Sequence, residues 1–161
     1  MTQDTANHKT FWKITKYAND TEFAKNSPYE HVTIEDNILL NEGIALILDL
    51  LMGVPGTVFD NASSYIGVGD GTTAESAAHT GLQGTNKAYA GMSSGYPQRS
   101  GQKVTWRAVF DGTSANFDWR EFTVSNSDSD AGVNLNRKVD VNQGTKGEGQ
   151  TWTIDLEITL T

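Results

Sequence analysis

The sequence contains no cysteine among its 161 residues and only three prolines. The absence of cysteine excludes disulfides, thiolate metal sites, iron–sulfur clusters and a cysteine nucleophile, and it leaves the redox compartment open. Basic residues are also few, since Lys and Arg number 12 against 20 Asp and Glu, a formal net charge of −8. Binding to nucleic acid or to an anionic membrane needs clustered Lys and Arg, so we expect neither partner.

A long uninterrupted apolar run is missing as well. The most apolar stretch, residues 38–54, is interrupted by Asn41, Glu42 and Asp49. It falls short of the roughly 20 apolar residues that span a bilayer. Residues 1–10 are polar and contain no apolar core of a signal peptide. We therefore expect no membrane span and no secretory signal.

This apolar stretch predicts one α-helix, over about residues 41–52. Asn41 is a favourable N-cap residue, Glu42 complements the helix dipole in the first turn, and Gly53 is placed to end the helix. Apolar residues lie on nearly every face, and only Asp49 breaks the pattern. The helix is therefore expected to be almost wholly buried, either as a plug inside a barrel or sandwich or in an interface between subunits.

From residue 64 onward, the pattern predicts about six or seven strands separated by turns. The last ten residues alternate most clearly. Five apolar side chains there are expected to face the core: Trp152, Ile154, Leu156, Ile158 and Leu160. We expect a mostly β fold, an antiparallel β-sandwich or small barrel that buries the helix of residues 41–52.

The first 35 residues are only sparsely apolar. We expect residues 1–35 to form an extended N-terminal arm ahead of a single β-rich domain of residues 36–161. Such an arm would lie on a neighbouring subunit, and its deletion would leave a folded domain. The residues expected to make the contacts are Phe11, Trp12, Ile14 and Tyr17.

Two glycine-rich segments match catalytic or binding motifs, but neither has the context that the chemistry needs. Residues 67–71 lack the third glycine of a dinucleotide-binding loop, because Thr72 stands there. Residues 91–95 match the G-x-S-x-G pattern of serine hydrolases, but all three histidines precede Ser93, whereas this motif needs a later histidine. We expect a strand-to-turn transition at the first segment and a chance match at the second.

Acidic turns offer a candidate cation site. Asp70, Asp128 and Asp130 could supply oxygen ligands to Ca²⁺, but the further carboxylates of a calcium-binding loop are missing. Solvated turns are therefore favoured. The sequence predicts no metal, no cofactor and no catalytic residue.

Charged residues next to aromatic ones suggest either an acid–base pair or a structural ion pair. Asp118 and Glu121 flank Trp119 and Arg120. A cross-strand ion pair needs no pocket and is favoured over catalysis. Arg137 alternates with apolar neighbours, so we expect it to point inward and to pair with one of these carboxylates.

Aromatic residues could also stack on a sugar. Trp106 and Trp152 occupy core positions of predicted strands, which leaves Trp12 and Trp119 as candidates for an outer surface. Tyr96, in a loop, is a further candidate. Exposed loop aromatics of this kind would favour contact with a glycan receptor.

Several segments together resemble small structural proteins of tailed bacteriophages. They are residues 40–43, 64–74, 96–97, 104–110, 115–121, 135–138 and 150–153. The likeness covers roughly residues 38–161 and marks turns and strands rather than a site. The resemblance implies a β-rich, non-enzymatic virion protein, often a homotrimer.

The hypothesis that follows is a capsid decoration (cement) protein, with the major capsid protein and further copies of itself as partners. It would be made in the host cytoplasm and would lie on the capsid surface of the virion. The alternative is a tail-fibre or head-fibre component that contacts a host receptor.

Overall fold

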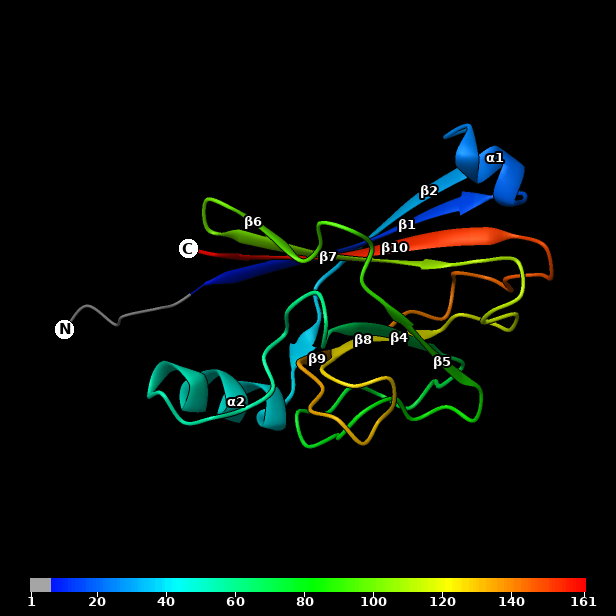
Figure 1. The fold of residues 1–161 in the computed structure, drawn as a ribbon. Coiled ribbons are helices and arrows are strands. Elements are labelled where there is room, and N and C mark those ends of the chain that lie inside the picture. The colour runs from blue at the N-terminus through cyan, green and yellow to red at the C-terminus, as the bar shows by residue number, and fades with distance from the viewer. Residues whose placement is uncertain (1–6) are drawn as a thin grey trace.

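Two five-stranded antiparallel sheets pack face to face in the computed structural model, which describes residues 7–161 (Figure 1). The strand order is β2-β1-β10-β7-β6 in the first sheet and β3-β9-β8-β4-β5 in the second. The prediction of a mostly β fold, an antiparallel β-sandwich, is confirmed.

The bounds of the elements are as follows. The first sheet contains β1 (His8–Tyr17), β2 (Glu30–Glu35), β6 (Gln98–Ser100), β7 (Lys103–Phe110) and β10 (Thr151–Leu160). The second sheet contains β3 (Ile38–Leu39), β4 (Tyr65–Gly69), β5 (Lys87–Gly91), β8 (Glu121–Ser125) and β9 (Asn136–Val139). The helices are α1 (Asp20–Ala24) and α2 (Asn41–Leu51).

Aromatic rings fill the core between the sheets. Trp119 packs edge to face against Phe110 and Trp152, with ring centroids 5.0 Å apart in both pairs. On β10, Ile154 and Leu156 are fully buried, as the alternating pattern predicted. Such edge-to-face pairs add about 0.5–1.5 kcal/mol each to the free energy of area burial.

The far end of β10 departs from the pattern. Ile158 is only partly buried, and Leu160 is 60% exposed. Figure 1 shows that the C-terminal end of β10, together with β6 and β7, extends past the second sheet. Side chains on this overhang therefore have no opposing sheet to pack against.

Strand β1 lies inside the first sheet. It pairs with β10 along its whole length, from His8 opposite Leu160 to Tyr17 opposite Thr151, and with β2 on its other side. The expected N-terminal arm is therefore wrong for residues 8–35, because this segment supplies β1 and β2 of the first sheet. Residues 1–6 of that predicted arm lie outside the described residues.

Helix α2 forms where it was predicted, but it is not buried. Its N-cap residue is Leu40 rather than Asn41, and only Gly43 and Leu46 on the helix are buried. Figure 1 shows α2 at the level of the second sheet, below the overhanging end of the first sheet. The helix contacts the sandwich along one stripe only, so most of its apolar side chains face solvent.

Candidate functional site

Helix α2 and the loop after it expose an unusual number of large apolar side chains. We call this region the α2 surface. Its members are Ile44, Ile47, Leu48, Leu51, Met52 and Val54. Their exposed fractions run from 39% for Ile47 to 77% for Leu51. Scattered exposed leucines are ordinary on monomers, but a contiguous apolar patch marks an interaction surface.

An apolar groove of about 160 Å³ adjoins the α2 surface. It separates α2 from the overhanging strands of the first sheet. Its apolar lining includes Leu39, Ile47, Val104, Leu135, Ile158 and Leu160. The helix and the overhang thus present one continuous apolar end of the molecule.

The first turn of α2 is fixed to the second sheet. A Cβ on Gly43 would lie 2.6 Å from the carbonyl oxygen of Leu135, so only glycine allows this close approach. The backbone N–H of Asn134 donates to Glu42 Oε1 at 2.7 Å, and the N–H of Asn41 donates to the carbonyl oxygen of Ala77 at 2.8 Å. The helix is therefore held at its N-terminal end, while its C-terminal turn projects away.

The expected pairing of Arg137 with a carboxylate is confirmed. Arg137 and Glu121 form an ion pair with both side chains fully buried, and Arg137 Nη2 lies 2.7 Å from Glu121 Oε2. Asp118 pairs instead with Arg120 at 2.8 Å, and both of these side chains are 39% exposed. One pair thus lies in the interior and the other on the surface.

The Glu121 carboxylate also holds a loop in place. Oε1 accepts hydrogen bonds from the backbone N–H groups of Gly71 at 3.2 Å, Gln83 at 3.0 Å and Gly84 at 2.7 Å. A Cβ on Gly71 would overlap this oxygen. Both oxygens of the carboxylate accept hydrogen bonds, so the group ties the loop to the strand.

The acidic turns have structural partners too. Asp130 accepts hydrogen bonds from the N–H of Leu82 and from the side chains of Lys87 and Tyr89. Burial raises the pKa of Tyr89, and the hydrogen bond to Asp130 raises it further. Across residues 7–161, no three His, Asp or Glu side chains are grouped so that they could hold a metal ion.

A second concave region lies on the outer face of the first sheet. We call it the outer pocket. It has a volume of about 480 Å³ and includes Tyr17, Phe23, His31, Ser93, Tyr96 and Arg107 in its lining. Ser93 of the G-x-S-x-G match and His31 thus line the same pocket, but the structure contains no hydrogen bond between their side chains. His31 Nδ1 lies 3.2 Å from the hydroxyl of Thr15 instead.

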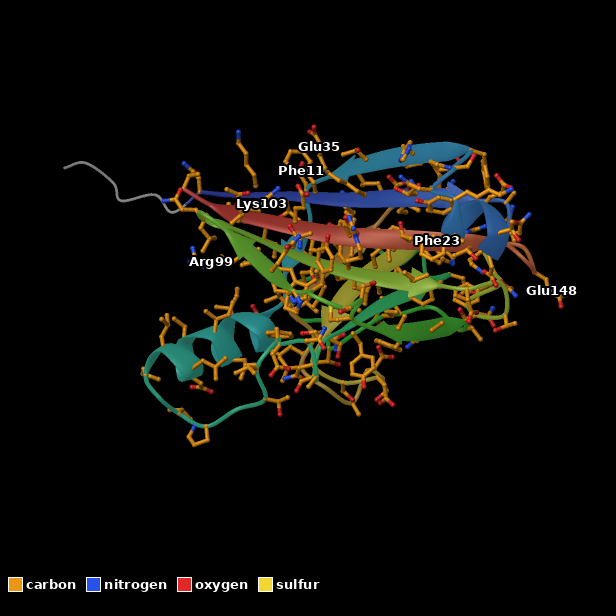
Figure 2. The ribbon with its side chains drawn as sticks, turned by 45° about the horizontal axis from the view of Figure 1, so that its top comes forward. Phe11, Phe23, Glu35, Arg99, Lys103 and Glu148 are labelled. Carbon is orange, nitrogen blue, oxygen red and sulfur yellow. The ribbon has the colours of Figure 1, made fainter. Side chains whose placement is uncertain are left out.

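Of the four residues predicted to make contacts from the N-terminal segment, three are buried and only Phe11 is partly exposed. Trp12 and Ile14 are fully buried in the core, so they cannot contact a partner. Tyr17 is also buried, under α1 at the outer pocket. Phe11 is partly exposed and lies opposite Glu35 of β2 (Figure 2).

The prediction that Trp12 and Trp119 stand on an outer surface, where they could stack on a sugar, is also wrong. Trp12 and Trp119 are both fully buried, so neither serves an outer surface. Tyr96 does line the outer pocket. Sequence reasoning missed Phe23 and Arg107 at the pocket, and the all-round apolarity of α2 left open whether this helix is a plug of the sandwich or an element of an interface.

Comparison with known proteins does not assign the chain to a family. No protein-family model, no curated protein and no solved structure matches the chain. Neither of the two helices described within residues 7–161 is long and apolar enough to cross a membrane.

Proposed function

We propose that the protein is a non-enzymatic structural protein of a bacteriophage virion, a capsid decoration protein whose α2 surface binds the major capsid protein on the outside of the head. The observation that carries the proposal is the apolar face of α2, which has no partner among the described residues. The resemblance of residues 38–161 to phage structural proteins supports it. The predicted N-terminal arm, which the fold does not provide over residues 8–35, is not part of it.

The spacing on α2 fits a known mode of recognition. Ile44, Ile47, Leu48 and Leu51 stand at positions i, i+3, i+4 and i+7, the pattern of anchors that a helix inserts into an apolar groove. Burying one leucine that would otherwise be exposed is worth about 1.5–3 kcal/mol. Three or four such anchors supply the core of a specific interface.

Charged residues border this apolar end. Arg99 and Lys103 stand at the overhanging end of the first sheet, on the same side of the molecule as α2 (Figure 2). An apolar centre with a polar rim is the usual composition of a protein interface. The −8 net charge of the whole chain disfavours unspecific association between copies.

The first test is cosedimentation of the purified protein with empty capsids of the same virus and, separately, with host cells. We expect saturable binding to capsids at a fixed stoichiometry. The homotrimer implied by the resemblance belongs to the same proposal, and the molar mass from light scattering tests it.

Matched variants locate the interface. The double variant Leu48→Ser, Leu51→Ser removes two anchors, and since every 1.4 kcal/mol is tenfold in affinity, it should bind capsids at least ~100-fold more weakly. The control is Val141→Ser, because Val141 is 51% exposed and follows β9, outside the α2 surface. Capsid binding that the double variant leaves unchanged would contradict the proposed interface.

The alternative function is that of a fibre component that contacts a host receptor. The outer pocket, which holds three aromatic side chains, favours it. Binding to host cells in the absence of capsid binding would support this alternative against decoration.

A further inference from the structure

The outer pocket lies away from the α2 surface. Figure 1 shows α1, which forms one wall of the pocket, and α2 at opposite ends of the molecule. A volume of about 480 Å³ falls within the roughly 300–1,000 Å³ of small-molecule sites. A decoration protein held on a capsid by α2 would therefore present this pocket to the surrounding medium.

One wall of the pocket is an aromatic pair. Phe23 of α1 packs edge to face against Tyr17 of β1, with ring centroids 5.2 Å apart and an interplanar angle of 79°. The Tyr17 hydroxyl donates to Asn26 Oδ1 at 3.2 Å, which joins the residues after α1 to the sheet. Phe23 remains 36% exposed, and Figure 2 places it beside the strands of the first sheet. An aromatic ring is thus fixed at the rim of the pocket and remains partly exposed.

The opposite wall is the loop that carries Tyr96. Its backbone is held by hydrogen bonds from Ser93 N–H to the carbonyl oxygen of Arg107 at 2.8 Å and from Tyr96 N–H to the carbonyl oxygen of Ser93 at 3.0 Å. Asn61 Nδ2 donates to the carbonyl oxygen of Ser93 at 3.2 Å. The guanidinium of Arg107 lies 4.6 Å from the centroid of the Tyr96 ring. This wall is therefore organised before any ligand binds.

The charge of the pocket is already balanced. Arg107 donates two hydrogen bonds to Asp155, at 2.7 and 2.6 Å, and these bonds raise the pKa of Arg107. The Asp155 carboxylate thus offsets the charge of the guanidinium and accepts two of its five N–H donors. Thr15, Thr153 and Ser94 add neutral hydroxyl groups to the lining. The pocket thus combines aromatic rings with uncharged donors and acceptors.

We propose that the outer pocket binds a neutral oligosaccharide. A sugar ring has an apolar C–H face, which fits an aromatic ring such as Phe23 or Tyr96, and an equatorial belt of hydroxyls, which fits side chains that both donate and accept hydrogen bonds. The fixed walls limit the entropy lost on binding.

The test is an array of immobilised neutral and acidic oligosaccharides, followed by isothermal titration with the strongest neutral binder. Phe23→Ala and Tyr96→Ala should each weaken its binding at least tenfold, and Phe23→Trp should retain it. The matched control is Tyr29→Ala, because Tyr29 is 52% exposed and lies outside the pocket lining. Thermal unfolding of each variant separates lost binding from lost folding, and the exposed position of Phe23 makes Phe23→Ala the decisive variant.

Three results would overturn the proposal. They are the absence of binding to any neutral oligosaccharide at ~10 mM, binding that Phe23→Ala leaves unchanged, and binding restricted to acidic oligosaccharides. Capsid binding by Phe23→Ala should equal that of the wild type, because the pocket and the α2 surface lie apart. The failure of this proposal is thereby distinguishable from the failure of the decoration function.

Discussion

Replacing Arg137 with methionine would leave the carboxylate of Glu121 without its cation in a site that excludes water. Both side chains are fully buried, and two guanidinium nitrogens of Arg137 lie within 2.9 Å of Glu121 Oε2. Breaking a buried ion pair by removing one partner costs about 3–5 kcal/mol. Since Glu121 keeps its hydrogen bonds from the loop backbone, we expect the lower part of that range, about 3 kcal/mol.

The surface pair supplies the matched control. Arg120 and Asp118 are joined at a similar distance, 2.8 Å, but both are 39% exposed. Exposed pairs contribute about 0–1 kcal/mol, so Arg120→Met should have little effect on the free energy of unfolding. The residue replaced and the residue introduced are the same in both variants. Arg137→Met also removes hydrogen bonds to the carbonyl oxygen of Thr73 at 3.0 Å and to His79 Nδ1 at 3.1 Å, and their loss adds to the cost at the buried site.

Urea unfolding followed by tryptophan fluorescence measures both variants, since Trp119 and Trp152 are buried in the core and report on its loss. Hydrogen exchange should also show faster opening at Gly71, Gln83 and Gly84 in Arg137→Met, because their partner Glu121 is destabilised. Equal losses of unfolding free energy for Arg137→Met and Arg120→Met would refute the reasoning.

Three further predictions concern the sheets and their acid sensitivity. Deleting residues 1–35 should abolish cooperative thermal unfolding, because it removes β1 and β2 from the first sheet; a sharp transition in the truncated protein would contradict this. Ile154→Asp should lower the free energy of unfolding in urea by about 3–5 kcal/mol, because it places a carboxylate in the core. Thr153→Asp, on the outer face of the first sheet, should lower it far less. Similar losses for the two variants would mean that the register of β10 differs from the one described. Hydrogen bonds from Thr113 lower the pKa of Asp111, so its stabilisation is present above the unfolded pKa of about 4 and is lost as the pH falls through the lower folded value. Asp111→Asn removes this titrating group, so the melting temperature of the variant should fall less steeply below pH ~4 than that of the wild type. An equally steep fall in the variant would show that Asp111 does not cause the acid sensitivity.

Sequence periodicity predicted the parts of the fold that depend on local pattern. The alternation around Ile154 and Leu156 identified the core face of β10, and the placement of Arg137 between apolar residues identified its inward orientation. The bounds of α2 followed from its apolar residues and from Gly53 after it. Each of these features is encoded within a short segment of chain.

The position of β1 inside the first sheet was not predicted, because this strand contains a buried lysine. Lys16 occupies a core-facing position, where its ammonium donates to the carbonyl oxygen of Gln143 at 2.8 Å and pairs with Glu30 at 2.7 Å. It also lies 4.5 Å from the ring of Trp152. Because this neutralisation depends on residues outside the segment, the partly alternating pattern around Trp12 indicates either a short strand or an extended segment and does not reveal a central strand.

The exposure of α2 and the outer pocket could not be predicted for a similar reason. An all-round apolar helix is compatible both with burial in its own chain and with a face left for a partner. The pocket combines Tyr17, Phe23, Tyr96 and Arg107, which only the pairing of distant strands brings together. Sequence pattern reports neither arrangement.

Hydrogen–deuterium exchange of the capsid-bound protein tests the central claim most directly. Peptides that cover residues 41–54 should exchange more slowly on capsids than in the free protein, because the α2 surface becomes buried there. Peptides that cover α1, residues 20–24, should exchange at the same rate in both states. Protection of α1 with no change in α2 would contradict the proposal that the apolar helix attaches this protein to the capsid.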